Sequence, residues 1–335
     1  MRIGLIGAGA VADYHIAAAL ELPNASISAV CDIDAVVAQR AAAAAGGASS
    51  FTDYRDMIDS GTVDAVIVNT PHSFHLPMVT DAARAGLHVL VEKPMATTLD
   101  DCDAMIAACD TAGVALTVGH IQHFMPDKVA AKEHIDSGEL GDVVMVRDFR
   151  STDYRPGTRS GWFFSPTVAG GGALINIGGH CIDRSLWFGG GRAERVLAST
   201  VNRFSSEVET DGTIALRLAN GIGASINVIS DPPLKADSLF IVCERGVVVA
   251  DPRSGTLVQV DGRSRVLHER HPDDIQHAFT AQLADFLDVI NGGRPTVPLS
   301  HARHVVEVVL ESYRSAAEGV ARTVGAAPVV SAGAR

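Results

Sequence analysis

The stretch "GLIGAGAVA", residues 4–12, decides the fold of the first half of this chain. Glycine at position 7 permits a tight turn after an apolar strand, and glycine at position 9 lets backbone amides approach a pyrophosphate. Ala12 still allows a helix to pack closely on the strand, and the first turn of that helix would offer free N–H groups to the phosphates. We therefore expect a dinucleotide-binding turn with four contact residues: Gly7, Gly9, Ala10 and Val11.

Short apolar runs alternate with alanine-rich stretches from residue 1 to about residue 120. Continuous β-branched runs between amphipathic helices are typical of a parallel sheet that is covered on both faces. This half is therefore predicted to be a doubly wound α/β domain. The expected strands are 3–7, 26–31, 64–69, 88–92 and 114–119, and the expected helices are 10–21, 34–45, 73–85 and 98–111.

The pattern changes beyond about residue 125, where runs with alternating polarity follow one another through short turns such as Asn220-Gly221. Such turns favour antiparallel pairing, so we predict an α+β domain with an open, mostly antiparallel sheet. Its strands are expected at 143–150, 193–202, 211–219, 222–230, 237–243, 246–250 and 256–267, and its helices at 125–137, 172–188, 273–291 and 300–320. The predicted division is 1–122, 123–325 and a flexible tail at 326–335.

A carboxylate follows the glycine turn at a meaningful distance. Asp32 ends the second apolar run 20 residues after Ala12, where it could accept hydrogen bonds from the ribose hydroxyls of an adenosine. The alternative is a helix cap, although Asp34 is better placed to cap the helix that follows. A carboxylate here repels a 2′-phosphate, and "CDID" (31–34) offers no neighbouring arginine, so NAD is favoured over NADP.

Composition excludes several classes of partner. A net charge of -12 argues against nucleic acid or an anionic membrane. Five cysteines without a CxxC pair indicate free thiols in a reducing compartment, and neither a signal peptide nor a membrane span is expected, so the predicted location is cytoplasmic. The 13 histidines form no HxH or HExxH motif, and no metal site is predicted from them.

The apolar run "HVLVE" continues into Lys93 and Pro94. Most charged strand ends only mark where a strand leaves the core, but the chain supplies nearly all its cations as arginine, and Lys93 is one of four lysines. An ammonium at the carboxyl end of a parallel strand can hydrogen-bond an oxygen that gains negative charge during a reaction. Partial burial would lower its pKa and make it a usable proton donor or acceptor.

The stretch "NTPHSFHLPMVTDAARAGLHVLVEKP", residues 69–94, resembles the glucose–fructose oxidoreductase/inositol dehydrogenase/rhizopine-catabolism (Gfo/Idh/MocA) oxidoreductases. "VGHIQHFMPDKVAAKEHIDSGELGDV", "GGGALINIGGHCIDRSLWFGG" and the closing "FLDVINGGRPTVPLSHARHVVEVVLESYRSA" fit the same family, so the resemblance covers nearly the whole chain. These motifs are specific for the family but not for a substrate. The resemblance implies a Rossmann domain joined to a domain with an open antiparallel sheet, with the substrate between them.

The resemblance also implies roles for single residues. Lys93 would reach the reacting oxygen, and His180 would act as the acid/base. The implied cofactor contacts are Asn69, Thr70, Pro71, His72, His75, Glu92, Lys93 and Gln122. The implied or suspected substrate contacts are Lys93, His123, Tyr154, Arg155, Trp162, Asn176 and His180.

Two positions depart from the family pattern. Asn176 stands where relatives often carry aspartate, and His123 stands where arginine is usual. Asn176 and His180 are four residues apart and would share one face of a helix. An amide can position a hydroxyl but cannot be a base, which leaves His180 as the main proton-transfer group with Lys93 as its partner. Asp183 could orient His180, or it could pair with Arg184 or a neighbouring loop. These alternatives remain open.

The expected function is NAD-dependent oxidation of a secondary hydroxyl of a sugar, polyol or related cyclic alcohol. Reduction of a keto-sugar, or a redox-assisted elimination with a retained cofactor, is the alternative within enzymes. A non-catalytic dinucleotide or sugar sensor would not need a proton-transfer pair, so it is less favoured. His180 could instead be a buried structural histidine, and the segment with Tyr154, Arg155 and Trp162 an ordinary surface loop. The expected assembly is a homodimer or homotetramer.

Overall fold

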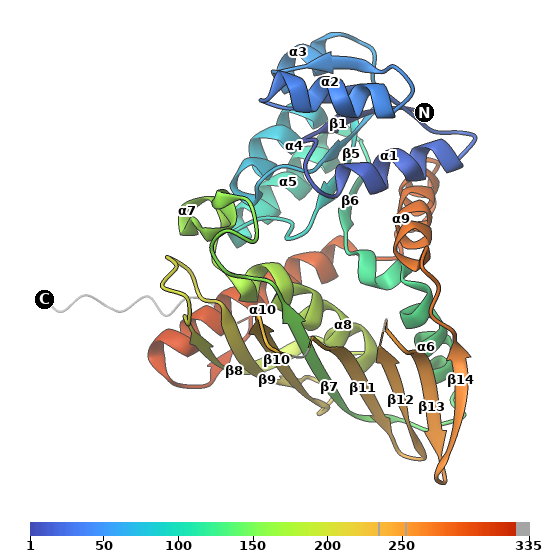
Figure 1. Ribbon diagram of the computed structural model, residues 1–335, viewed down its shortest axis with the longest axis vertical. Coiled ribbons are helices and arrows are strands. Elements are labelled where there is room, and N and C mark those ends of the chain that lie inside the picture. Colours follow the sequence, from blue (N-terminus) through green and yellow to red (C-terminus); the bar gives the residue numbers. More distant parts are fainter. Residues whose placement is uncertain (234, 252, 326–335) are drawn as a thin grey trace, which may run out of the picture.

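The computed structural model describes residues 1–233, 235–251 and 253–325, so the predicted tail at 326–335 lies outside the described residues. The chain forms an α/β lobe and a second lobe built on a broad sheet (Figure 1). Within the described residues, no helix is long and apolar enough to cross a membrane.

The first lobe confirms the doubly wound prediction. Its six strands are parallel and ordered β3-β2-β1-β4-β5-β6, so the order reverses between β1 and β4. Ligands bind open sheets of this kind at such a reversal, outside the carboxyl ends of the strands. The strands are β1 Arg2–Ile6, β2 Ser26–Cys31, β3 Ser49–Phe51, β4 Ala65–Val68, β5 His88–Glu92 and β6 Leu116–Gly119.

Helices cover both faces of this sheet: α1 Ala12–Glu21, α2 Ala35–Ala44, α3 Tyr54–Asp59, α4 His75–Arg84 and α5 Leu99–Ala112, with a 3₁₀ turn, η1, at His72–Phe74. Strand β4 shows why its sequence is continuously apolar, because all its side chains are buried. The short elements β3 and α3 were not predicted. Two of the three residues of β3 are exposed, so its sequence carries no apolar run.

The second lobe contains a nine-stranded sheet ordered β14-β13-β12-β11-β7-β10-β9-β8-β15. Among the strand pairs of the described residues, only β7–β10 is parallel, so the mostly antiparallel prediction is confirmed. The strands are β7 Val143–Thr152, β8 Ala193–Val201, β9 Asp211–Leu218, β10 Gly223–Ser230, β11 Asp237–Cys243, β12 Gly246–Asp251, β13 Gly255–Val260, β14 Arg263–His268 and β15 Arg322–Thr323.

The single strand predicted at 256–267 is wrong. The chain reverses between β13 and β14 at Asp261 and Gly262, which both have positive φ (49° and 73°). A two-residue turn with positive φ at both positions matches the twist of the flanking strands, and Asp-Gly is a favoured sequence for it. The segment is therefore a hairpin.

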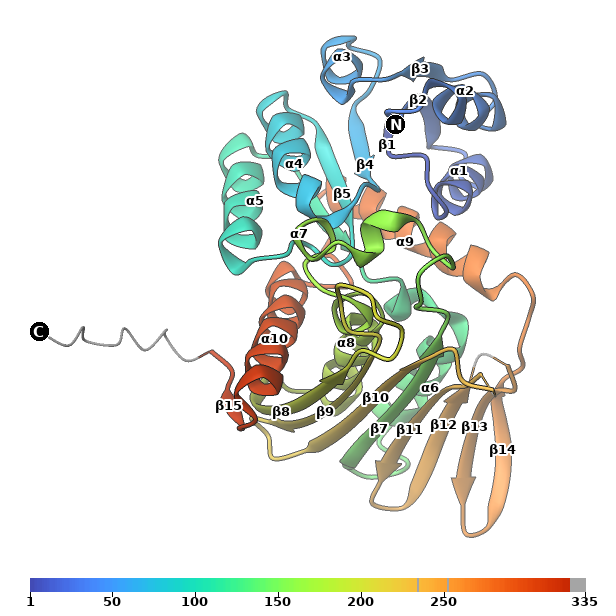
Figure 2. The same ribbon diagram turned by 60° about the vertical axis from the view of Figure 1, so that its left-hand side comes forward.

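Helices α6 and α8 pack against the nine-stranded sheet, whereas α7, α9 and α10 also contact the first lobe. The helical elements of the second half are η2 Ile121–Phe124, α6 Pro126–Asp136, η3 Gly161–Phe164, α7 Pro166–Ala169, a π-helical turn η4 Leu174–Gly178, α8 Gly179–Gly189, α9 Asp274–Ile290 and α10 Leu299–Glu318. Helix α9 returns to the first lobe, where Phe279, Leu283 and Phe286 join the core around β1 and α1 (Figure 1). Helix α10 gives Val306 to the first core and Val305 to the second. Figure 2 shows that α7 also lies at the junction of the two lobes.

Candidate active site

The glycine turn fits a phosphate group closely. Gly7 has φ +92°, and a Cβ there would lie 2.6 Å from the Asn69 carbonyl oxygen, so both its conformation and the close approach of β4 require glycine. A Cβ at Gly9 would meet no atom of the described residues within 4 Å. The space beside Gly9 is therefore open to a ligand that approaches the backbone.

The start of α1 is available to the same ligand. The residue before the helix is Val11, and no side chain of the described residues caps its first turn. Ala10 is exposed, so the N–H groups at this helix end face outward. Uncapped amides and the positive end of the helix dipole suit an anion, as expected from the sequence.

Asp32 is held at the carboxyl end of β2 beside this turn. One carboxylate oxygen accepts a hydrogen bond from the Ala8 amide at 2.9 Å, and the other accepts from the Asp34 amide at 3.0 Å. Asp34 caps α2 by accepting from the Val36 amide at 2.9 Å, so the capping role belongs to Asp34. Ile33 is 95% exposed next to Asp32 and offers an apolar surface to a flat ring. These features fit the adenosine half of a dinucleotide.

The ends of β4 and β5 are braced by two histidines. His75 is fully buried, with Nε2 at 3.0 Å from the Thr70 carbonyl oxygen and Nδ1 at 3.1 Å from that of Pro94. His72 is buried, with Nδ1 2.7 Å from the Ala169 carbonyl oxygen of α7. These rings therefore fix Thr70, Pro71 and the β5 exit in place. Their predicted contact with a cofactor stays a prediction.

Asn69 and Gln122 also have protein partners. Asn69 donates to the Gly7 carbonyl oxygen at 3.2 Å, which ties β4 to the glycine turn. Gln122 is buried and accepts a hydrogen bond from Arg184 at 3.3 Å. Both side chains hold the walls of the site, and their direct contact with a cofactor likewise stays a prediction.

Glu92 prepares the surroundings of Lys93. His15 lies 3.0 Å from one Glu92 oxygen, and the other accepts from the Lys93 amide at 3.2 Å. Burial opposes ionisation of Glu92, but the hydrogen bond from His15 and the charge of Lys93 outweigh it and hold its pKa below the usual value. Glu92 is therefore a fixed negative charge next to the Lys93 ammonium.

Lys93 reaches from the first lobe to the second. Its Nζ donates to the backbone oxygen of Asn176 at 3.1 Å and to the side-chain oxygen of Asn176 at 3.2 Å. Burial lowers the pKa of Lys93 to about 8, with Arg150 and Arg159 acting in the same direction and Glu92 opposing them. Its ammonium is thus predominant at pH 7 but can lose its proton at mild cost.

Asn176 and His180 lie on the helical segment that faces Lys93. Asn176 sits in the π-helical turn η4, a feature that often occurs at functional sites, and His180 lies in the first turn of α8. Burial lowers the pKa of His180 well below its ordinary value, and the charges of Lys93 and Arg150 lower it further. His180 is therefore neutral at physiological pH and has a ring nitrogen available as an acceptor, although the same effects disfavour the imidazolium that forms when it takes a proton.

Three polar atoms near Lys93 have no protein partner in the described part of the chain: Asn176 Nδ2, His180 Nδ1 and Arg150 Nη1. An ammonium can only donate, so the Asn176 oxygen faces Lys93 and its NH₂ group faces elsewhere. Buried polar atoms without partners are rare in native proteins and indicate that a bound molecule completes the site. The oxygens of a polyhydroxy compound have the chemistry to do so.

Three of the groups around the site were missed from the sequence. Arg150 lies on β7 with Nε 3.6 Å from Asp237, and β7 packs against α8. Glu209 accepts from the Leu174 amide and the Tyr313 hydroxyl, both at 2.8 Å, and so holds the start of η4. A Cβ at Gly171 would overlap the Tyr313 hydroxyl, which explains part of the glycine run. The two-residue period of a strand is the signal that could have indicated Arg150, because it places Arg150 on the same face of β7 as the buried residues Val146 and Asp148.

The loop after β7 places the predicted substrate contacts unequally. Tyr154 is fully buried, and its hydroxyl donates to the Phe163 carbonyl oxygen at 2.7 Å, so it supports the loop from beneath. Arg155 is exposed and lies 3.2 Å from Asp231. The Trp162 ring stacks on Phe163 at 3.7 Å and meets His72 edge-on at 5.0 Å, which brings it to the junction of the lobes. Trp162 therefore lies at that junction, and the Tyr154 hydroxyl neighbours the side chain of Asn176, whereas Arg155 is turned toward Asp231.

His123 and Asp183 belong to a separate buried group. His123 Nε2 lies 2.9 Å from Asp183, and His301 Nε2 lies 2.7 Å from the same oxygen. Arg184 pairs instead with Asp148 at 2.5 Å and with Asp237 at 2.6 Å. Of the alternatives left open for Asp183, pairing with Arg184 is wrong. The polar side of His123 faces this carboxylate, and its substrate contact stays a prediction.

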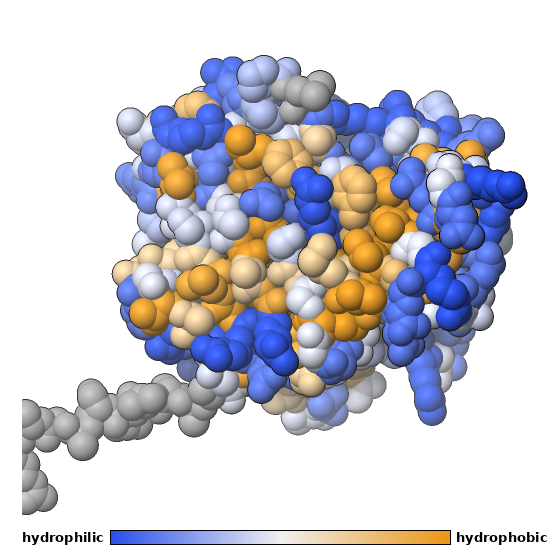
Figure 3. All heavy atoms as spheres, turned by 90° about the horizontal axis from the view of Figure 1, so that it is seen from below, coloured by the Kyte–Doolittle hydropathy of each residue, from blue (hydrophilic) through white to orange (hydrophobic). Residues whose placement is uncertain are grey.

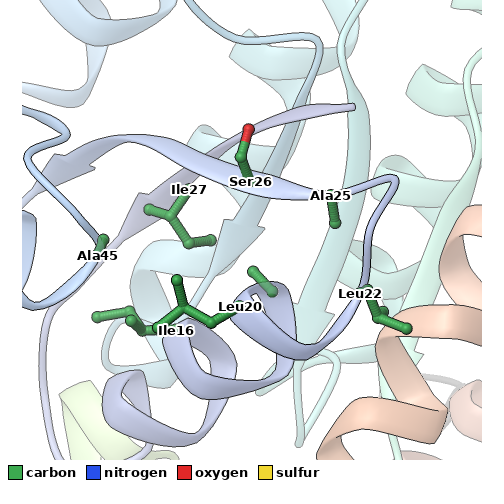
Figure 4. A pocket seen from close by; sticks show the side chains of 8 residues that line it. Ile16, Leu20, Leu22, Ala25, Ser26, Ile27 and Ala45 are labelled. Carbon is green, nitrogen blue, oxygen red and sulfur yellow. The ribbon is translucent and has the colours of Figure 1, made fainter.

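A surface hollow elsewhere in the first lobe carries no comparable chemistry. It lies between α1 and the start of β2, and Ile16, Leu20 and Ile27 are among its lining side chains (Figure 4). Ser26 is its one polar lining residue, so it offers neither a proton-transfer group nor a phosphate contact. We therefore assign the candidate active site to the junction at Lys93.

Comparisons with known proteins agree with this geometry. A family model described as "Oxidoreductase family, NAD-binding Rossmann fold" (GFO_IDH_MocA) matches residues 1–120, and one described as "GFO/IDH/MocA C-terminal domain" matches residues 129–249. The chain is 32% identical over 269 residues to inositol 2-dehydrogenase of Rubrobacter xylanophilus, covering 77% of this chain and 74% of that protein.

Two further relatives cover more of the chain. The rhizopine catabolism protein MocA of Rhizobium meliloti is 28% identical over 301 residues, which are 88% of each chain. The crystal structure of the WlbA dehydrogenase from Bordetella pertussis, in complex with NADH and UDP-GlcNAcA, superposes with a TM-score of 0.85 at 28% identity and covers 98% of both chains. Both lobes of this chain thus align with MocA in sequence and with the WlbA dehydrogenase in structure.

Proposed function

Because this chain belongs to the Gfo/Idh/MocA family of NAD-binding oxidoreductases, we propose that it is an NAD-dependent dehydrogenase that oxidises a secondary hydroxyl group of a sugar, polyol or related cyclic alcohol. One observation carries the proposal. The Lys93 ammonium of the first lobe bonds both oxygens of Asn176 at the lobe junction, where His180 is neutral and partly unpaired. Oxidation of an alcohol removes the hydroxyl proton as well as a hydride, and two proton-transfer groups at this place could handle that proton.

The residues present fit a dinucleotide along one edge of the sheet. Gly7, Gly9 and the free start of α1 would hold the pyrophosphate, and Asp32 would hold the adenosine ribose. Thr70, Pro71 and Glu92 would lie along the nicotinamide half, as the family resemblance implies. When bound, the nicotinamide supplies a hydride acceptor.

The chain's own residues would handle the proton and the charge. Lys93 would donate a hydrogen bond to the reacting oxygen and stabilise the negative charge that develops on it. His180, neutral in its buried position, would accept the hydroxyl proton. Asn176 would orient the Lys93 ammonium with its oxygens and a neighbouring substrate hydroxyl with its free NH₂ group. Arg150 would bind a further substrate oxygen.

A substrate screen tests the function directly. The purified protein with NAD would be assayed for NADH formation at about 340 nm against a panel of polyols, neutral sugars and sugar acids, the last included because of Arg150. Turnover of a compound with a secondary hydroxyl supports the proposal. Turnover only of keto-sugars with NADH would favour the reductase alternative, and binding without turnover the sensor.

The cofactor preference is predicted to be strong. Asp32 should make NAD(H) bind at least tenfold more tightly than NADP(H), or about 1.4 kcal/mol, because its carboxylate repels a 2′-phosphate. Calorimetric titration of both cofactors measures this. Asp32→Ala should remove most of the difference, whereas Asp53→Ala, which removes the cap of α3 in the same lobe, should retain it. Equal affinities in the wild-type protein would show that Asp32 faces away from the ribose.

We also propose that the chain forms a homodimer or a dimer of dimers in the cytoplasm. The outer face of the nine-stranded sheet is partly apolar (Figure 3). Paired positions on neighbouring strands place Met145, Phe240, Val242, Val247 and Val249 side by side on it, and Met145 is 42% exposed. Contiguous apolar patches on a sheet face commonly mark an interface. The five buried thiols support a reducing compartment.

Light scattering at micromolar concentration should therefore give at least twice the 35.0 kDa chain mass. Val242→Lys should shift the mass toward the monomer, because it places a charge in the middle of the apolar face. Val36→Lys on α2 of the first lobe, where the side chain is 74% exposed, is the matched control away from this face and should leave the mass unchanged. A monomeric mass for the wild-type protein would contradict the proposal.

A further inference from the structure

We propose that Asp183, His123 and His301 form a site for one divalent transition-metal ion, with Zn²⁺ as the expected occupant and His120 beside it. These four residues are called the histidine cluster below. The proposal does not depend on the oxidoreductase function, because it concerns what the cluster binds and not what the enzyme oxidises.

Three ligand atoms converge in the cluster from separate elements. His123 Nε2 from η2 and His301 Nε2 from the first turn of α10 lie 2.9 Å and 2.7 Å from Asp183 Oδ1 of α8. One nitrogen from each histidine and one carboxylate oxygen lie within 4.8 Å of one another. Ligands about 2.0–2.2 Å from a tetrahedral Zn²⁺ ion lie roughly 3.3–3.6 Å apart, so each imidazole nitrogen would move away from Asp183 by less than about 1 Å when the ion binds.

Unpartnered atoms of the cluster are an independent sign of a missing ligand. Asp183 Oδ2, His123 Nδ1 and both ring nitrogens of His120 are buried, and none has a hydrogen-bond partner among the described residues. His120 is 2% exposed, and its Nδ1 lies 3.4 Å from Asp183 Oδ2, a contact longer than an ordinary hydrogen bond. Such groups in a native structure call for an unobserved water or ion. A cation would satisfy both the carboxylate and the imidazoles.

The donor set selects the kind of cation. Two imidazole nitrogens and one carboxylate oxygen suit Zn²⁺ and neighbouring transition metals, whereas Mg²⁺ and Ca²⁺ prefer oxygen ligands. The His123 ring stacks on Trp187 at 4.1 Å, which fixes its direction.

The cluster has an entry side and a rigid base. The His301 side chain is 21% exposed, whereas that of Asp183 is fully buried, so an ion can reach the site past His301. Asp183 follows His180 by one turn of α8, so the ion would lie behind the proton-transfer histidine. The ligands are 60 and 118 residues apart along the chain, and no local motif could therefore have indicated them.

The alternative is a purely hydrogen-bonded group, in which both imidazoles donate to one oxygen of Asp183. Equilibrium dialysis of the full-length protein against ZnCl₂, followed by elemental analysis, separates the two. We expect about one zinc per chain and, at saturating zinc, a rise in Tm of at least about 3 °C, since an ion that binds only the folded state stabilises it. Failure to retain zinc, with no change in Tm, would overturn the proposal.

Variants locate the ion. His301→Gln replaces the partly exposed ligand and should lower zinc affinity by about 10-fold or more, because it leaves only two of the three ligands. His271→Gln changes an exposed histidine and should retain wild-type affinity. Circular dichroism checks that both variants are folded. If His301→Gln does not fold, the visible absorption of Co²⁺ added to the wild-type protein reports whether the metal is bound by protein ligands. Equal zinc affinity in His301→Gln and wild-type protein would count against the site.

Discussion

Replacing Lys93 by methionine is expected to lower kcat/KM by about 10²–10⁴-fold, or roughly 3–5 kcal/mol of activation barrier. Methionine keeps much of the side-chain volume but removes the ammonium that bonds Asn176 and, as proposed, the reacting oxygen. NAD affinity should change little, because the proposed contacts of the pyrophosphate and ribose lie at Gly9 and Asp32. Initial rates on the substrate found by the screen, with calorimetry for NAD, measure both effects.

Lys132→Met is the matched control, because it makes the same chemical change at a lysine of α6 that pairs with Asp136. Its activity should equal that of the wild-type protein. Stability gives a second discrimination. The lowered pKa of Lys93 means that the folded state disfavours its charged form, so removing the charge should leave Tm unchanged or raise it at pH 7. Near wild-type turnover in Lys93→Met would show that Lys93 has no catalytic role and is an ordinary charged residue at the end of a strand.

The pH dependence follows from the same pKa of about 8. If the reaction needs the Lys93 ammonium, kcat/KM for oxidation should be high below pH 8 and fall as the pH rises through that value. This falling limb should vanish in Lys93→Met. A limb that rises through pH 8 would instead show that neutral Lys93 takes the proton, which would transfer the role of base away from His180.

The fold of the first lobe could be predicted because each buried parallel strand is a continuous apolar run bounded by turns. β2 and β5 occur at the predicted residues, 26–31 and 88–92. β3 could not be found in this way, since a three-residue edge strand with exposed side chains has no apolar pattern. The β13–β14 hairpin was not predicted although Asp261-Gly262 is a turn signal, because apolar residues continue on both sides of the turn, at Val258 and Val260 and at Val266 and Leu267.

The site divides along a similar line. Lys93, Asn176 and His180 lie in motifs that can be read locally, and the structure brings Lys93 into hydrogen-bonding contact with Asn176. Arg150, Glu209 and the histidines that contact Asp183 are far apart in the sequence and come together only in the tertiary structure. Histidines raise a further difficulty, because sequence does not say what a ring faces. His72 and His75 follow the predicted strand 64–69, yet His72 Nδ1 and both ring nitrogens of His75 face backbone carbonyls.

Replacing His180 by asparagine is expected to lower kcat/KM by about 10²–10⁴-fold as well, because the variant loses the group that accepts the proton. Asparagine retains some hydrogen bonding, so the fold should persist, as circular dichroism can verify. His277→Asn, at an exposed position on α9, is the matched control and should have wild-type activity. Turnover near the wild-type rate in His180→Asn would identify His180 as a buried structural histidine.

The combination of the two changes tests whether Lys93 and His180 act as a unit. If they share one proton transfer, the double variant should be little worse than the worse single variant, whereas independent contributions would multiply. Their coupling has a further expected consequence. The charge of Lys93 is one of the causes that lower the pKa of His180, so Lys93→Met should raise that pKa. As the pH is lowered, the residual activity of Lys93→Met should then begin to fall at a higher pH than the activity of the wild-type protein does. An unchanged acidic limb would show that the two side chains do not sense each other.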